Sequence, residues 1–199
     1  MKSKISLFFG VLCAMFLAFD AVAYQIIETN LPTIVSNSSV AFRGKCESRE
    51  VKTVEQGTMT GVVTHYVFTV TEVMKGEIGN RFEFDVWGAT RADAKKTGAP
   101  YAVGFVQFDP GREYVVFLTG PTDLGVYAPM GMALGVFNVT YSAEGRAMVV
   151  NSFKNSNLFK GAKSARFTKA IKAANIDEKS PPAGPLPYDD FKKMVDVLK

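Results

Sequence analysis

Alternation of apolar and polar side chains between residues 40 and 151 is the feature that most constrains the fold of this chain. In the first run, Val40, Phe42 and Cys46 share one parity, while Arg43 and the charged residues that follow it at every second position share the other. Side chains of a strand point alternately to its two faces, so the pattern predicts strands with one buried and one solvated face. Glycine-containing turns interrupt the pattern, and we expect about six strands. Cys46 is predicted to point inward.

Later runs extend this prediction. Tyr66 and Phe68 lie on one side of a second strand, and His65 lies on the other side with threonines. A third strand places Trp87 on its polar side. Residues 113–118 are apolar at both parities, which is typical of a central strand with both faces covered.

Helical periodicity replaces the alternation near the C-terminal end. Apolar residues from Phe167 to Ala174 recur at a spacing close to 3.6, and we expect this helix to begin after Ser164 and to end at Asn175. Prolines then predict an extended linker over 181–187, because they cannot continue a helix.

A last amphipathic helix is expected to begin at Tyr188, where two aspartates suit the positive end of the helix dipole. Its apolar stripe is predicted to pack against the β-structure. We therefore expect a β-barrel domain over residues 24–152 and a helical extension over 153–199 that packs on it.

The first 23 residues have the three parts of a cleavable signal peptide. Lysines near the start precede an apolar run over 5–19, and Ala21-Val22-Ala23 provides a small-x-small cleavage site. The run is shorter than the roughly 20 apolar residues of a spanning helix, and Asp20 ends it. We predict that residues 1–23 are removed, that the mature chain begins at Tyr24 without a transmembrane segment, and that it is exported to the periplasm or the medium.

Cysteine and histidine are scarce in the predicted mature chain. Cleavage removes Cys13 and leaves Cys46 alone, so no intramolecular disulfide is expected despite the oxidising destination. His65 is the single histidine. Zinc, haem and iron–sulfur sites need several such ligands, so we expect no cofactor.

Catalysis by a thiol would need Cys46 beside a base, and His65 is the one histidine available. The alternation places the two side chains on opposite faces unless a bulge intervenes. The sequence also lacks the serine-elbow, zinc-protease and phosphate-loop motifs. We predict that the protein is not an enzyme and keep a Cys46-dependent enzyme as an alternative.

Charge is distributed unevenly along the chain. The formal net charge of +4 is too small to imply a nucleic-acid partner. From residue 147 to residue 176, however, there is no acidic residue. An anionic partner is one hypothesis for this stretch, and a solvated helix whose lysines point around it is the alternative. The candidate binding residues are Lys160, Lys163, Arg166, Lys169 and Lys172, with Trp87 as a separate aromatic candidate.

A family resemblance rests on strand-like segments along most of the predicted mature chain. They are Y-V-F-T-V-T-E-V-M-K-G at 66–76, G-R-E-Y-V-V-F-L at 111–118, P-M-G at 129–131, G-V-F-N-V at 135–139 and Y-D-D-F at 188–191. The chain resembles a widespread group of secreted bacterial proteins. Its layout is also similar to netrin-like modules and tissue metalloprotease inhibitors, which are OB-type barrels.

The resemblance implies a mainly β fold, a closed or partly open OB-like barrel with short C-terminal helices. Inhibitory members of that family chelate a protease zinc through an N-terminal cysteine. The predicted mature terminus here is Tyr24, so this mechanism is not carried over.

The sequence predicts a non-catalytic binding module whose partner is another extracellular protein or an anionic surface. The alternative is an inhibitor of an extracellular enzyme that acts through loops expected at 91–100 and 120–131.

Overall fold

The computed structural model describes residues 29–56, 59–89, 91–97, 106–177 and 180–199. The predicted signal peptide and Tyr24 lie outside the described residues. The strands are β1 (Val40–Gln56), β2 (Met59–Lys75), β3 (Arg81–Trp87), β4 (Glu113–Leu118), β5 (Val126–Tyr127), β6 (Val136–Tyr141), β7 (Ala147–Asn151) and β8 (Leu186–Pro187). The helices are α2 (Leu31–Asn37), α3 (Arg91–Thr97), the short 3-10 helix η1 (Met132–Gly135), α4 (Ala165–Ala173) and α5 (Tyr188–Leu198).

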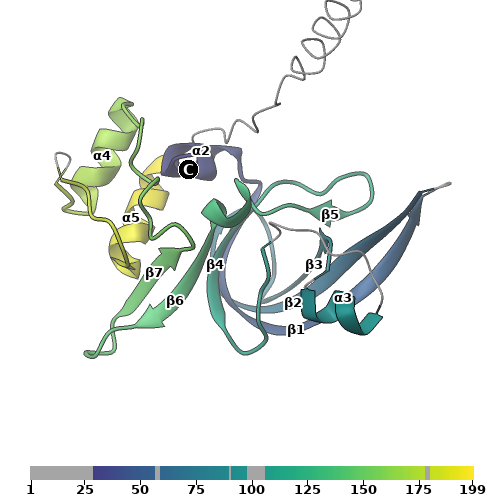
Figure 1. Ribbon diagram of the computed structural model, residues 1–199. Helices are drawn as coiled ribbons and strands as arrows, with labels where there is room; N and C mark the ends of the chain where they lie inside the picture. Colours follow the sequence, from purple (N-terminus) through teal and green to yellow (C-terminus); the bar gives the residue numbers. More distant parts are fainter. Residues whose placement is uncertain (1–28, 57–58, 90, 98–105, 178–179) are drawn as a thin grey trace, which may run out of the picture.

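The eight strands of the described residues belong to one sheet with the order β5-β3-β2-β1-β4-β6-β7-β8. Neighbouring strands are antiparallel except β3 and β5, which are parallel. Figure 1 shows β1 and β2 as long curved strands that wrap around one side of the molecule, while β6 and β7 lead away toward the helices. The chain is thus mainly β with added helices, as predicted.

The sheet is open and does not close into a barrel, so the closed form of the expected closed or partly open barrel is wrong. The segment after β5 does return to β4, where Met130 N donates to Phe117 O at 2.8 Å and Thr119 N donates to Ala128 O at 2.9 Å. This contact contains one isolated β-bridge, between Leu118 and Pro129. The sheet does not close there because β6 occupies the edge of β4 and continues it outward through β7 and β8.

An aromatic inner core fills the curl of the sheet. Phe68 lies at the centre of this core, with ring-centroid distances of 5.3 Å to both Phe42 and Phe108. Cys46 is fully buried in the same core, which confirms its predicted direction. A bulge between Cys46 and Ser48 changes the register of β1 against β2, so the parities beyond it are shifted.

An outer core lies between the other face of the sheet and helices α2, α4 and α5. Phe137 of β6 packs on Phe191 of α5 at a centroid distance of 4.7 Å, and Phe117 of β4 packs on the same ring at 6.2 Å. Strand β4 thus contributes Val116 to the inner core and Phe117 to the outer core. The prediction of a central strand over 113–118 is confirmed.

The two predicted C-terminal helices are present. Ser164 caps α4 by accepting a hydrogen bond from Phe167 N at 3.1 Å, and α5 begins at Tyr188. Within the described chain, no helix has the length and apolar character needed to cross a bilayer.

Three elements differ from the expected layout. The predicted loop at 91–100 contains α3 in its described part, and α2 was not expected at all. Leu186 and Pro187 of the expected linker form the edge strand β8 on β7. An edge position suits Pro187 because proline has no N–H to donate to a further strand.

Candidate binding pocket

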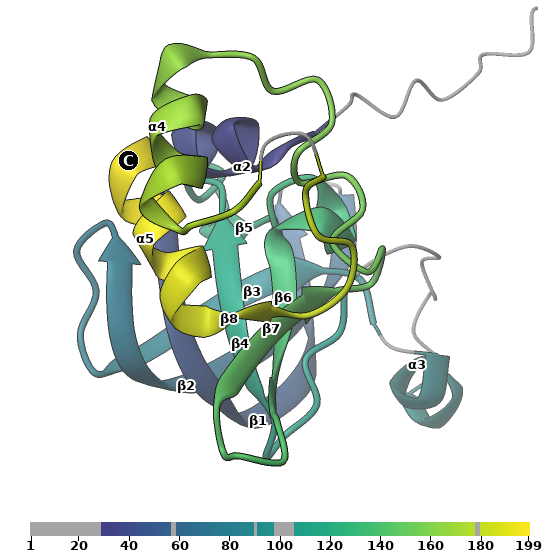
Figure 2. The same ribbon diagram turned by 90° about the vertical axis from the view of Figure 1, so that its left-hand side faces the viewer.

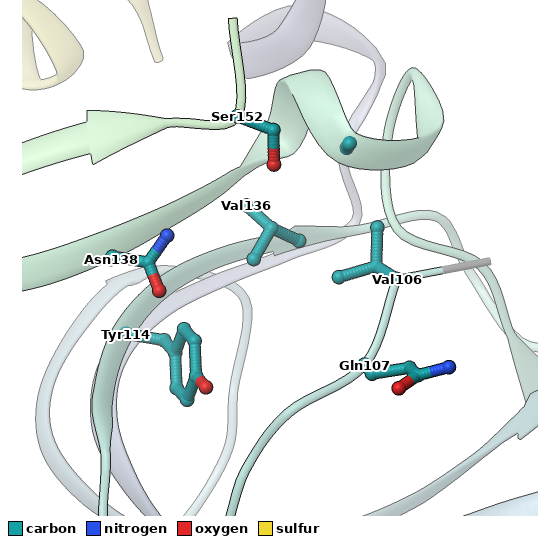
Figure 3. Close-up of a pocket in the computed structure, with 7 residues that line it drawn as sticks. Val106, Gln107, Tyr114, Val136, Asn138 and Ser152 are labelled. Carbon is teal, nitrogen blue, oxygen red and sulfur yellow. The ribbon is translucent and has the colours of Figure 1, made fainter. Parts of the chain in front are cut away.

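An open pocket of about 340 Å³ lies at the rim of the inner core (Figure 3). It is lined by Val106, Gln107, Tyr114, Ala133, Val136, Asn138 and Ser152. In Figure 3, Tyr114 and Asn138 lie on one side of Val136, Val106 and Gln107 lie on the other, and the hydroxyl of Ser152 points toward the space between them. The lining joins an apolar floor to several neutral polar groups.

The divergence of β6 from β4 makes room for the pocket. The two strands pair at three positions only, from Tyr114 with Asn138 to Val116 with Val136. Beyond Asn138, β6 pairs with β7 alone. Asn138 lies two residues from Val136 and therefore points to the same face, where the inner core ends. The strand alternation thus places an amide group at the edge of an apolar surface.

A turn after β7 positions Ser152. Asn151 and Asn155 are both buried and bond to each other's backbone, because the Oδ1 of each accepts from the backbone N of the other at 2.9 Å. Asn155 Nδ2 also donates to Val149 O at 2.9 Å and to Gly184 O at 2.7 Å. These bonds satisfy groups that a buried turn would otherwise leave unpaired.

Helix η1 brings Ala133 to the pocket. Its last residue closes a tight turn, in which Gly135 N donates to Met130 O at 2.8 Å. A Cβ atom on Gly135 would lie 2.4 Å from that carbonyl oxygen, a distance that real Cβ atoms essentially never show. Glycine is therefore needed at 135 for this close approach.

The polar side chains of the pocket are available to a ligand. Among the described residues, none provides a hydrogen-bond partner for the side chains of Gln107, Asn138 or Ser152. The hydroxyl of Tyr114 accepts from Asp109 N at 2.9 Å and keeps its own proton to donate. Burial raises the pKa of Tyr114, which keeps this proton in place at neutral pH. Apart from Tyr114, the described residues that line the pocket have no titratable side chain, so the lining is neutral.

Comparisons with known proteins do not assign the chain to a family. No protein-family model matches the chain, and no curated protein matches it. The resemblance to secreted netrin-like proteins therefore stays a prediction.

The predicted basic residues lie outside the pocket. Lys160 and Lys163 precede α4, and Arg166, Lys169 and Lys172 lie along its exposed side. Three of the five thus lie on one helix and two lie in the segment before it, and none of them lines the pocket.

Trp87 lies at the end of β3 and is half-buried. Its ring covers Gly61, where an added Cβ would lie 2.4 Å from the ring atom Cζ3. Part of the surface of Trp87 is therefore used within the sheet.

Cys46 and His65 lie on opposite faces of the sheet. The thiol of Cys46 contacts Ser48 O at 3.7 Å and Phe108 O at 3.9 Å in the inner core, and burial raises its pKa to about 11. His65 lies outside the curl, with Nδ1 at 2.6 Å from an Asp85 oxygen and Nε2 at 3.3 Å from a Glu83 oxygen. The structure does not bring the two residues together as a dyad.

Sequence reasoning missed the pocket. The sequence N-S-F-K-N at 151–155 holds a recognisable signal, because asparagine favours turns and left-handed backbone. That signal predicts a turn, but it does not show that the turn faces β6 across an apolar floor.

Proposed function

We propose that the protein is an exported, non-catalytic binding module that holds a small uncharged ligand in the pocket between β4, β6 and the turn after β7. The observation that carries this proposal is the set of unpartnered polar groups of Asn138 and Ser152 beside the apolar floor formed by Val136. Binding sites typically combine an apolar lining with a few such groups, and the volume of about 340 Å³ lies at the small end of their range.

The proposed ligand class follows from the lining. A charged ligand would lose hydration without finding an opposite charge, whereas a neutral one satisfies amide and hydroxyl groups directly. Amides offer both donors and acceptors, and Ser152 and Tyr114 add hydroxyl groups. Uncharged molecules with several hydrogen-bonding groups, of about the size of a monosaccharide or a dipeptide, fit this chemistry.

Export and an OB-like relationship are further parts of the proposal. The three-part N-terminal pattern supports export. The curl of β1 to β4 around one aromatic core, with β3 and β5 parallel, supports a partly open OB-like arrangement.

Two alternative functions predict different experimental outcomes. Inhibition of an extracellular enzyme through segments 91–100 and 120–131 predicts loss of activity in a protease panel. A Cys46-dependent enzyme predicts rapid alkylation of the folded protein, which burial and the raised pKa of Cys46 oppose.

Titration by NMR tests the binding proposal. The probes are a panel of uncharged mono- and disaccharides and a panel of N-acetylated, C-amidated dipeptides, so that the two arms separate sugars from amides. We expect one arm to shift the side-chain amide signals of Asn138 and Gln107 in a saturable manner. Loss of one hydrogen bond in Asn138→Leu should weaken binding about fivefold to tenfold.

A matched control separates the pocket from general effects. Asn37→Leu makes the same chemical change at an exposed position on α2 and should bind like the wild type. Absence of saturable shifts in both arms, or equal weakening by Asn138→Leu and Asn37→Leu, would reject the proposal.

A further inference from the structure

The exposed side of α4 carries a cluster of cations that is separate from the pocket. We define the α4 basic face as Lys163, Arg166, Lys169 and Lys172, all of which are exposed. The opposite side of the helix is buried in the outer core through Phe167, Ala170 and Ile171. Because the apolar side is fixed inward, the cations must face outward. Figures 1 and 2 show α4 at one end of the molecule and α3 at the other.

The lysines of this face have no acidic partner in the part of the chain that the structure describes. Within the described residues, none of Lys163, Lys169 and Lys172 has a carboxylate at ion-pair distance. The neighbouring helix α5 differs, because its lysines pair with its own acids at 2.9–3.1 Å, as Lys193 does with Asp190 at 2.9 Å. The absence of acids from residue 147 to residue 176 explains this difference. Among the described residues, no acidic side chain therefore neutralises these lysines through an ion pair.

Arg166 has a structural role within the face. Its Nε donates to Val197 O at 2.8 Å, and its Nη2 donates to Lys199 O. A cation at this position suits the negative end of the α5 dipole. The three lysines are thus the part of the face that remains for a partner.

The shape of the face favours a diffuse anionic surface. Residues three apart on a helix are offset by about 60°, so Arg166, Lys169 and Lys172 spread over an arc of about 120° instead of forming a line, and Lys163 lies just before the helix. Between them, the exposed residues Ala165 and Ala173 provide little contact area. Protein interfaces depend on large anchors such as tryptophan, tyrosine or arginine, which this set of lysines and alanines lacks.

We propose that the α4 basic face binds the anionic headgroups of a phospholipid bilayer. Flexible lysine stems allow the three ammonium groups to reach one plane together, and each acts as a point charge that needs no fixed partner geometry. Each lysine near an anionic membrane contributes roughly a fivefold increase in binding, so three together contribute roughly 100-fold. This proposal is independent of the pocket ligand.

Co-sedimentation with vesicles tests the proposal on the full mature chain. The probes are vesicles of phosphatidylglycerol and phosphatidylcholine in equal parts and vesicles of phosphatidylcholine alone, in about 0.1 M NaCl. We expect roughly 100-fold tighter binding to the anionic vesicles. The variant Lys163→Gln/Lys169→Gln/Lys172→Gln should lose most of this preference, and high salt should remove it.

A charge-matched control keeps the test specific. Lys45→Gln/Lys95→Gln/Lys96→Gln removes the same charge from exposed positions on β1 and on α3 at the far end. The affinity of this control variant for the anionic vesicles should stay within about twofold of the wild-type affinity, because charges beyond a Debye length are screened. Equal binding to both vesicle types, or equal losses in the two triple variants, would overturn the proposal. Retention on heparin or DNA without vesicle binding would overturn it as well, in favour of a polymeric anion.

Discussion

Asn155 connects three segments of the chain and should dominate the stability of the pocket turn. Its side chain accepts from Asn151 N at 2.9 Å and donates to Val149 O at 2.9 Å and to Gly184 O at 2.7 Å. The residue is fully buried and has a φ of 59°, in the left-handed region that asparagine tolerates. Asn155→Ala removes the three bonds and places an alanine in that backbone conformation.

The expected cost follows from these contacts. Three buried hydrogen bonds at about 1 kcal/mol each give about 3 kcal/mol. The left-handed backbone adds about 1 kcal/mol for alanine. We expect Asn155→Ala to lower the free energy of unfolding by about 4 kcal/mol. Asn155→Gly should cost about 1 kcal/mol less, because glycine accepts the positive φ without strain.

Urea unfolding at 25 °C measures these differences. With a slope of about 2 kcal/mol/M, Asn155→Ala should shift the midpoint by about 2 M. Asn157→Ala, a half-buried asparagine two residues on, is the control and should cost about 0.5 kcal/mol. A loss below about 1 kcal/mol for Asn155→Ala, or one equal to that of Asn157→Ala, would refute the reasoning that these bonds hold the turn.

Three further predictions concern the sheet. Gly61→Ala should cost about 1–3 kcal/mol because the new Cβ would lie 2.4 Å from the Trp87 ring. Trp87 is the single tryptophan, so its emission should shift to longer wavelength, and an unchanged spectrum would contradict the predicted displacement. Burial raises the pKa of Cys46 from 9.0 to about 11, so its contribution to stability is complete below pH 9 and is lost as the pH rises toward 11. The free energy of unfolding should therefore fall less steeply over that range in Cys46→Ala, and parallel curves would argue against the raised pKa. Arg43→Met should cost about 1–3 kcal/mol because it removes a contact of 2.7 Å to the half-buried Glu113, and added Glu113→Gln should recover part of the loss. A double-mutant cycle by urea unfolding checks the pair, and additive losses would exclude a direct coupling.

The elements predicted best are those fixed by local pattern. Residues 114–118 are apolar at both parities because β4 separates the two cores, and that cause acts on each side chain from Tyr114 to Leu118. Ser164 marks the start of α4 for a similarly local reason, since its hydroxyl caps the first turn. Periodicity and capping both depend on residues that are close together in the sequence.

Sheet closure could not be predicted in the same way. Whether β4 pairs with the segment after β5 or with β6 depends on which segment reaches that edge, and the local sequence pattern does not decide this. The pocket was missed for a related reason. Asn138 has the pattern of an ordinary strand residue, and its neighbour Ser152 comes from a turn whose position depends on Gly184 far along the chain.

The open sheet, the pocket and the C-terminal helices depend on one another. Strand β6 leaves β4 after Asn138 and follows β7, whose far edge is held by β8. Strand β8 leads directly into α5, and Phe191 of α5 packs on Phe137 of β6. Asn155 joins the pocket turn to the same C-terminal segment through Gly184. The C-terminal segment therefore holds β6 and β7 away from the curl, and a closed barrel with β6 folded in would fill the space where the ligand is proposed to bind.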